Sequence, residues 1–140
     1  MANTPAFTNQ AKQDFLNGVH QPGDVYKIAL YNSTAAFDKT TTVYTGTNEV
    51  ANGNGYATGG ATLSGFVVSI DTDTAYIDWT VDPSWPAATF TARGAMIYNS
   101  SRSNKAIAIL DFGADKTSSG GTFLVTLPAA AAATAMIRIA

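Results

Sequence analysis

The chain has 140 residues, of which 46% are hydrophobic, 13% are charged and none is cysteine. A chain of this length forms one domain with its own core. Its formal net charge of −2 provides no basic excess for phosphate neutralisation, which argues against a direct nucleic-acid partner. The lack of cysteine excludes disulfides, thiolate zinc sites and thiol nucleophiles.

The first residues, MANTPAFTNQ, have neither the positive start nor the apolar stretch that is typical of a secretion signal. No segment approaches the ~18 apolar residues that a membrane span needs. We therefore expect a soluble protein with no membrane partner. Its surface relies on Thr, Ser, Asn and Gly more than on charge, a composition also found on faces that pack against other proteins.

Residues 1–22 are predicted to form an N-terminal arm followed by one short helix. Thr8 is a suitable N-cap, Phe7, Ala11 and Phe15 recur at helical spacing, and Gly18 provides a C-terminal stop. The arm cannot form a core alone, which makes it a candidate for strand addition at a sheet edge of a partner.

The remaining residues, 23–140, are predicted to form a single β-sandwich domain. In DVYKIALY, Tyr26, Ile28 and Leu30 alternate with their neighbours, which indicates a strand with one buried face. Similar patterns predict further strands at 63–71, 75–80, 87–91, 93–99, 105–112, 122–127 and 135–139. About eight short strands at regular spacing favour a sandwich, a jelly roll or a barrel. Among these we expect an all-β, jelly-roll-like antiparallel sandwich with one short helix.

The connections between these strands are rich in turn-forming residues. Hairpin joints are predicted at 71–74 (DTDT), 99–104 (NSSRSN) and 113–121 (GADKTSSGG). The segment 44–60 contains many Gly, Asn and Thr residues, and we expect a poorly constrained docking loop there. The alanine-rich run after Pro128 is too short for an independent helix and is predicted to be a tight connection.

The catalytic patterns in the chain are weak. His20 is the only histidine, and a Ser or Thr nucleophile would need it as a base, with a carboxylate such as Asp24 to orient it. No G-x-S-x-G elbow accompanies it, and a lone histidine at a helix end is more often a cap or packing residue. We therefore expect no enzyme and no catalytic residue.

Two binding patterns are equally incomplete. Asp71, Asp73 and Asp78 form an oxygen-rich cluster, but DTDTAYID lacks the glycine and the terminal glutamate of a calcium loop. GNGYATGG lacks the lysine and the following helix of a phosphate-binding loop. A pair of carboxylates for glycoside hydrolysis is not evident either, since Glu49 is the only glutamate. The sequence thus predicts no metal and no cofactor.

Aromatic side chains are the stronger candidates for contacts. Trp79 lies on an alternating strand and is predicted to be core, whereas Trp85, between Pro83 and Pro86, is expected on a rigid loop from which it protrudes. With tyrosines of the loops, Trp85 would form a stacking platform for a carbohydrate, which is one alternative function.

Several segments resemble small virion structural proteins of tailed bacteriophages, and the resemblance extends over nearly the whole chain. These segments are FLNGVH (15–20), YKIALY (26–31), NEVANGNGYATGGATLSG (48–65), ARGAMIYNSS (92–101), AIAILDFG (106–113) and IRIA (137–140). Within that group the chain is most similar to capsid cement, or head decoration, proteins. None of the segments is a catalytic motif, so the resemblance assigns no role to a single residue.

The resemblance implies a jelly-roll unit that assembles as a homo-oligomer, a dimer or trimer, on the outer surface of the capsid after synthesis in the bacterial cytoplasm. Its partner would be the major capsid protein, whose neighbouring subunits it would bridge, and it would stabilise the head against the pressure of packed DNA. A tail- or fibre-associated virion protein is an alternative with the same architecture. The residues that we expect to contact a partner are Phe7, Tyr44, Tyr56, Trp85 and Arg102.

Overall fold

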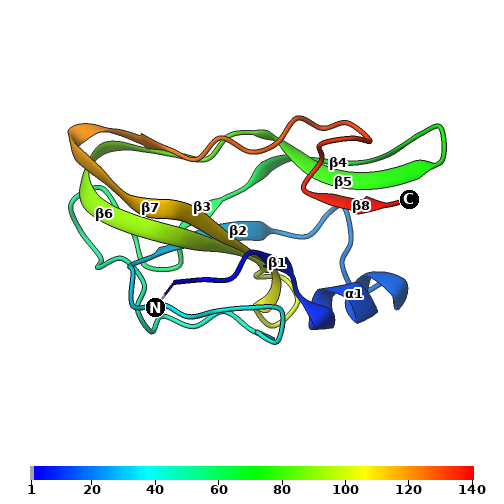
Figure 1. The fold of residues 1–140 in the computed structure, drawn as a ribbon, viewed down its shortest axis with the longest axis horizontal. Coiled ribbons are helices and arrows are strands. Elements are labelled where there is room, and N and C mark those ends of the chain that lie inside the picture. The colour runs from blue at the N-terminus through cyan, green and yellow to red at the C-terminus, as the bar shows by residue number, and fades with distance from the viewer. Residues whose placement is uncertain (1) are drawn as a thin grey trace.

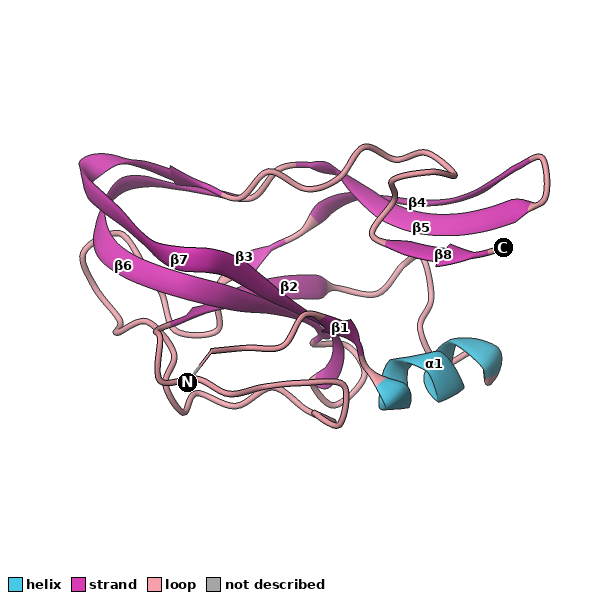
Figure 2. Ribbon diagram, in the orientation of Figure 1, coloured by secondary structure: helices cyan, strands magenta, loops and turns pink. Residues whose placement is uncertain are grey.

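The computed structural model describes residues 2–140 as a two-layered, mostly antiparallel β-sandwich with one short helix (Figures 1 and 2). One sheet has five strands in the order β1-β7-β6-β2-β3, and the other has three in the order β4-β5-β8. The predicted all-β sandwich is therefore confirmed. The elements are β1 (Ala6–Phe7), α1 (Asn9–Leu16), β2 (Tyr26–Tyr31), β3 (Ala61–Thr62), β4 (Ser64–Asp71), β5 (Thr74–Val81), β6 (Ser84–Asn99), β7 (Lys105–Leu124) and β8 (Ile137–Ile139).

The part of the five-stranded sheet around β2 is buried on both faces. On the face toward the second sheet, Ile28, Leu30 and Ile97 join the main core, whereas Tyr31 and Met96 belong to a second cluster on the opposite face. The segment between β2 and β3 covers that opposite face, with Ala35, Phe37 and Tyr44 packed against the cluster. The prediction of one buried face for residues 26–31 is therefore wrong, because a long loop supplies a second apolar layer.

Strands β6 and β7 form one long, bent ribbon that connects the two layers (Figure 1). Strand β6 contains the predicted strands 87–91 and 93–99, and β7 contains 105–112 and the first half of 122–127. The hairpin joint predicted at 113–121 lies inside β7 instead. Gly113 and Gly120 both take positive φ, and bulges interrupt the ladder beside them, so the ribbon bends without losing its pairing. The prediction failed because glycine and serine at a bend look like a turn in the sequence.

The three-stranded sheet contains the shorter hairpin, β4–β5. Its turn follows Asp71, as predicted for 71–74, and Asp71 pairs with Thr74. On the other side of β5, β8 pairs in antiparallel register and forms an edge of the sheet. Phe66 and Trp79 close the core at this sheet, where both rings pack against Tyr26.

The helix forms where it was predicted. The Thr8 hydroxyl accepts the N–H of Ala11 at 3.1 Å and donates to the carbonyl of Ala106 at 2.9 Å, so this N-cap also fastens the helix to β7. At the other end Gly18 has φ +70°, as a C-terminal stop requires. No helix within residues 2–140 is long and apolar enough to cross a membrane.

The N-terminal arm is part of the chain's own sheet. Ala6 and Phe7 pair with β7, and the buried side chain of Asn3 bridges the carbonyl of Leu110 and the N–H of Phe37. At Gly94 a Cβ atom would lie 2.7 Å from Nδ2 of Asn3, so the arm crosses the sheet at a place that only glycine leaves open. The arm is thus the edge strand of its own five-stranded sheet, and its addition to a partner's sheet stays a prediction.

Two further segments bear on the predictions. The run after Pro128 forms turns, with the N–H of Ala135 bonded to the carbonyl of Ala131, which confirms the tight connection. The segment 44–60 lacks a strand but is not poorly constrained, because polar contacts described below hold it against β2.

Candidate functional site

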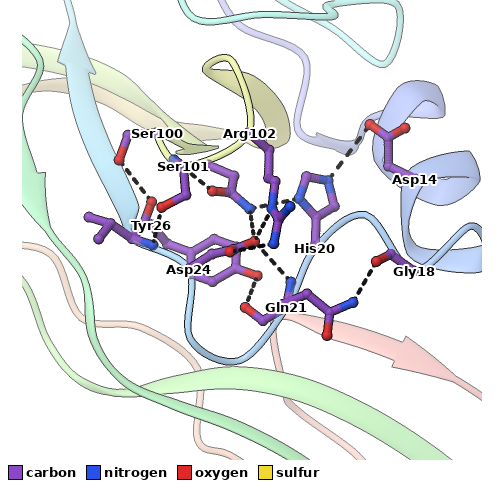
Figure 3. Close-up of polar contacts among 11 residues, drawn as sticks. Asp14, Gly18, His20, Gln21, Asp24, Tyr26, Ser100, Ser101 and Arg102 are labelled. Carbon is purple, nitrogen blue, oxygen red and sulfur yellow. Dashed lines mark hydrogen bonds and ion pairs between the residues drawn. The ribbon is translucent and has the colours of Figure 1, made fainter.

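A cluster of polar side chains connects the tip of the β6–β7 hairpin to the segment between α1 and β2. We call it the polar clasp and define it as His20, Asp24, Asn99 and Arg102 (Figure 3). The sequence analysis singled out three of these residues for different reasons. The structure brings them together through Asn99.

Asp24 is the acceptor at the centre of the clasp. Its Oδ1 accepts a hydrogen bond from Nη2 of Arg102 and its Oδ2 accepts one from Nε, both at 2.9 Å, so the pair is bidentate (Figure 3). Oδ2 also accepts Nδ2 of Asn99 at 2.8 Å and the N–H of Gln21 at 3.0 Å. These donors, the Arg102 guanidinium first, hold the pKa of Asp24 well below its usual range. The carboxylate is therefore ionised at neutral pH.

Asn99 is fully buried at the end of β6 and uses its whole amide group. Nδ2 donates to Asp24 and lies 2.9 Å from Nδ1 of His20, while Oδ1 accepts the N–H of Ser101 at 3.0 Å. The two contacts to Asp24 and Ser101 fix the orientation of the amide, so Nδ1 of His20 has to be an acceptor. In this arrangement the neutral imidazole carries its proton on Nε2.

His20 itself is buried between the clasp and the helix. Its Nε2 lies 3.8 Å from Oδ2 of Asp14, and neither atom has a hydrogen-bond partner among the described residues. Lys105 completes this side, with Nζ 3.3 Å from the same oxygen of Asp14. Burial lowers the pKa of His20, and the Asp14 and Asp24 charges oppose that shift only in part.

The polar clasp connects two segments of the chain. It is not the arrangement of Ser, His and Asp that the sequence analysis considered. Of the hydroxyls at the hairpin tip, Ser101 Oγ accepts the N–H of Val25 and Ser100 Oγ donates to the carbonyl of the same residue, both at 2.9 Å. Within residues 2–140, no hydroxyl is hydrogen-bonded to His20. The hairpin tip predicted at 99–104 is confirmed, and its polar residues bind it to the start of β2.

Arg102, proposed as a contact to a partner, is exposed at the tip but its guanidinium is held by Asp24. Phe7 is half-buried on β1, where its ring packs against Phe15 with centroids 5.8 Å apart. Whether either residue touches a partner stays a prediction. Both have contacts within the chain that explain their positions.

Tyr44 and Tyr56 surround the only glutamate of the chain. Their hydroxyls donate to Glu49 at 2.7 and 2.6 Å, and the N–H of Gly59 donates to it at 2.7 Å. The Tyr44 ring also stacks on Tyr98, with centroids 4.5 Å apart. Burial and the nearby Glu49 carboxylate raise the pKa of both Tyr44 and Tyr56. The carboxylate thus acts as an anchor for the segment 44–60.

The structure places Tyr56 and Trp85 inside the molecule. Their side chains are only 3% and 5% exposed, and Trp85 lies on β6 with its ring facing Tyr56 and Phe123. The expectation that Trp85 protrudes is wrong, because the flanking prolines begin a paired strand instead of a loop. Neither ring offers a surface for stacking on a sugar.

The acidic cluster is also dispersed. Asp71 and Asp73 are exposed at the turn of β4–β5, whereas Asp78 is fully buried and accepts the N–H groups of Trp79 and Met136 at 2.8 and 3.2 Å. Burial raises the pKa of Asp78. No group of three potential metal-binding side chains occurs in the described part of the chain.

Sequence reasoning missed Asn99 and Asp14, which complete the clasp and its link to the helix. For Asn99 a signal was present, since it directly follows the apolar run AMIY and is followed by a turn, where an amide can bond backward and forward. Asp14 carried no such signal, because its role depends on Lys105 and His20 from distant parts of the chain.

Comparison with protein families, with curated proteins and with solved structures finds no match for this chain.

Proposed function

We propose that this chain is a virion structural protein, and specifically a cement or decoration protein on the outer surface of a tailed-bacteriophage capsid. The observation that carries the proposal is the resemblance of the quoted segments, which extend from Phe15 to Ala140. A small all-β sandwich with a sparse charge coat is compatible with such a role.

The structure adds a reason to look for function in surfaces instead of in a reactive centre. The polar clasp and the Glu49 anchor use their side chains within the chain, as described above. Eight large apolar side chains are nevertheless well exposed among the described residues. Exposed apolar residues that gather in patches mark sites of association.

Binding to the assembled shell would explain how such a chain stabilises it. A ligand that binds only the assembled lattice shifts the equilibrium toward assembly by mass action. Many copies that bridge neighbouring subunits of the major capsid protein add their contributions, although each contact is modest. The head would then resist the outward pressure of its DNA.

The test uses heads that were assembled without this chain. Purified chain should adsorb to them at many sites and raise their resistance to heat and osmotic shock. Failure to adsorb, or adsorption that leaves the resistance unchanged, would contradict the proposal. The alternative of a tail- or fibre-associated protein predicts few copies per virion and an immunogold label at the tail.

A further inference from the structure

The inner face of the β4-β5-β8 sheet extends beyond the core and is only partly covered there, since Ile137 is buried whereas its neighbours toward the end of the sheet are exposed. The register places Val68, Ile77 and Ile137 in one row across the three strands, and Ile70, Ala75 and Ile139 in the next. The row nearer the core, Phe66 and Trp79, packs on Tyr26, as described above. Beyond it Val68, Ile70 and Ile139 are 57%, 67% and 60% exposed. We call this end of the sheet the overhang.

An apolar groove of about 540 Å³ separates the overhang from the helix. Phe15 and Leu16 of α1 form part of its lining, opposite Val68, Ile77 and Ile139 of the sheet. Leu16 is 85% exposed. Figure 2 shows the three-stranded sheet on one side of this region and α1 on the other. The sheet and the helix thus face each other across an apolar groove, as two layers of a sandwich face each other across a core.

Charges of opposite sign lie at the two parts of this region. Lys12 lines the groove, whereas Asp71 and Asp73 lie at the turn that ends the overhang. Within residues 2–140, the ion pairs involve none of these three side chains. Arg138 alternates with Ile137 and Ile139 along β8 and donates to the carbonyl of Ala133, so its charge is used within the chain. One molecule therefore carries both an apolar element with an acidic tip and an apolar groove with a lysine at its rim.

We propose that the groove binds the overhang of a second copy of this chain, and that the two copies form a dimer with twofold symmetry. Each overhang would enter the groove of the other copy, with Ile70 and Ile139 against Leu16 and with the acidic tip beside Lys12. A twofold axis requires this kind of self-complementary surface, in which the same patch serves both molecules. Each copy contributes one overhang and one groove. The acidic tip of each copy therefore lies beside Lys12 of the other, and each apolar overhang contacts the apolar groove of the other copy.

The composition of the patch suits such a contact, since a stable interface has an apolar centre with a polar rim. The overhang and the exposed end of α1 provide the apolar centre, and Lys12, Asp71 and Asp73 provide the rim. The inference does not depend on the proposed function, since it concerns the purified chain alone.

The test is sedimentation velocity on the purified chain over about a hundredfold range of concentration, because a dimer dissociates on dilution. The wild-type chain should show a dimer that dissociates as it is diluted. Ile70→Asp and Leu16→Asp should each raise the dissociation constant at least about tenfold. Leu124→Asp is the matched control, since Leu124 is 56% exposed but does not line the groove, and it should leave the dimer unchanged.

A charge exchange tests the orientation without touching the apolar residues. Lys12→Asp should weaken the dimer, and Lys12→Asp combined with Asp71→Lys and Asp73→Lys should restore it. These positions are exposed, so at concentrations where every protein is monomeric the variants should keep the wild-type melting temperature.

Three results would overturn the proposal. The first is a wild-type chain that stays monomeric at every concentration, and the second is an Ile70→Asp variant that dimerises as the wild type does. The third is a triple variant that dimerises no better than Lys12→Asp alone. A monomeric chain that needs Ile70 to adsorb to empty heads would assign the groove to the shell protein instead. Such a result would reject the dimer and leave the proposed function intact.

Discussion

The two hairpin tips, at residues 99–104 and 71–74, have similar polar sequences and opposite surroundings. At the first tip, Asn99 and Arg102 bind Asp24, and Ser100 and Ser101 bind the backbone of Val25. At the second tip, within the described residues, the only hydrogen bond that an aspartate side chain accepts is a long one of 3.4 Å, from the Thr72 hydroxyl to Asp71. The first tip is fastened to the molecule, and the second ends an uncovered apolar face.

The difference shows that the composition of a turn does not reveal its role. A partner segment of complementary polarity, residues 17–25, converts the first tip into a joint between distant parts of the chain. The second tip has no such segment, so its acidic residues and the apolar rows behind them stay available. The comparison therefore predicts that substitutions at the first tip change stability and that those at the second change association.

The largest expected effect on stability comes from Asn99→Ala. It removes a buried amide that donates to His20 and Asp24 and accepts the N–H of Ser101. Nδ1 of His20 and Oδ2 of Asp24 then lack this donor. We expect the free energy of unfolding, measured in urea, to fall by about 3 kcal/mol. Asp73→Ala at the other tip is the control and should change it by less than about 0.5 kcal/mol. Equal effects at the two tips would refute the contrast.

The next effect is a dependence on pH that arises from His20. The unfolded chain binds a proton at this histidine near pH 6.5, whereas burial lowers the pKa in the folded chain. Protonation also conflicts with Nδ1 as the acceptor for Asn99. The stability that the neutral form contributes is therefore present above pH 6.5 and is lost as the pH falls through that value, by at most about 1.4 kcal/mol per pH unit.

The measurement is the melting temperature between pH 8 and pH 5 for the wild type and for His20→Asn, whose oxygen can replace Nδ1 as an acceptor. The charged neighbours of His20 are Asp14, Asp24, Lys105 and Arg102, which are present in both proteins, so the comparison isolates the contribution of His20. The wild type should lose stability more steeply on acidification. Identical slopes would show that His20 does not titrate with unfolding.

A smaller effect is expected from Arg102→Lys. Lysine keeps the charge but cannot make the bidentate contact to Asp24, so the pKa of that carboxylate should rise toward its usual value. Carbon-detected NMR of the Asp24 carboxyl group reports the shift directly. An unchanged titration would mean that Asn99 and Gln21, not Arg102, determine the ionisation of Asp24.

The smallest effect concerns Thr72 at the second tip. Its φ of +55° lies in the left-handed region, which a β-branched residue adopts at a cost. Thr72→Asn should raise the free energy of unfolding by about 0.5 kcal/mol, because asparagine tolerates this conformation better. Thermal unfolding provides the measurement, and a decrease in the melting temperature would contradict the expectation.

The local features of this fold were accessible from the sequence. Thr8 and Gly18 delimit the helix, DTDT and NSSRSN form hairpin turns, and the all-β class follows from alternating runs. Each of these depends on neighbours within a few residues, so the pattern alone contains the information.

Features that depend on distant contacts were not accessible. Trp85 is buried because Phe123 lies across the β6–β7 ladder, and residues 26–31 are buried on both faces because residues 32–48 fold over them. The clasp was predictable only as separate residues, since nothing in the sequence indicates that Asn99 lies beside His20. The overhang was not accessible for the same reason, because it depends on how much of the three-stranded sheet the rest of the chain covers.

The central claim is that this chain acts through its surface, as a stabilising component bound among coat subunits. Electron cryomicroscopy of heads from virions that contain the chain tests it most directly. The account predicts repeated density that fits this sandwich on the outer surface of the head, at the joints between neighbouring major capsid subunits. Heads without such density, or density confined to the tail, would contradict it.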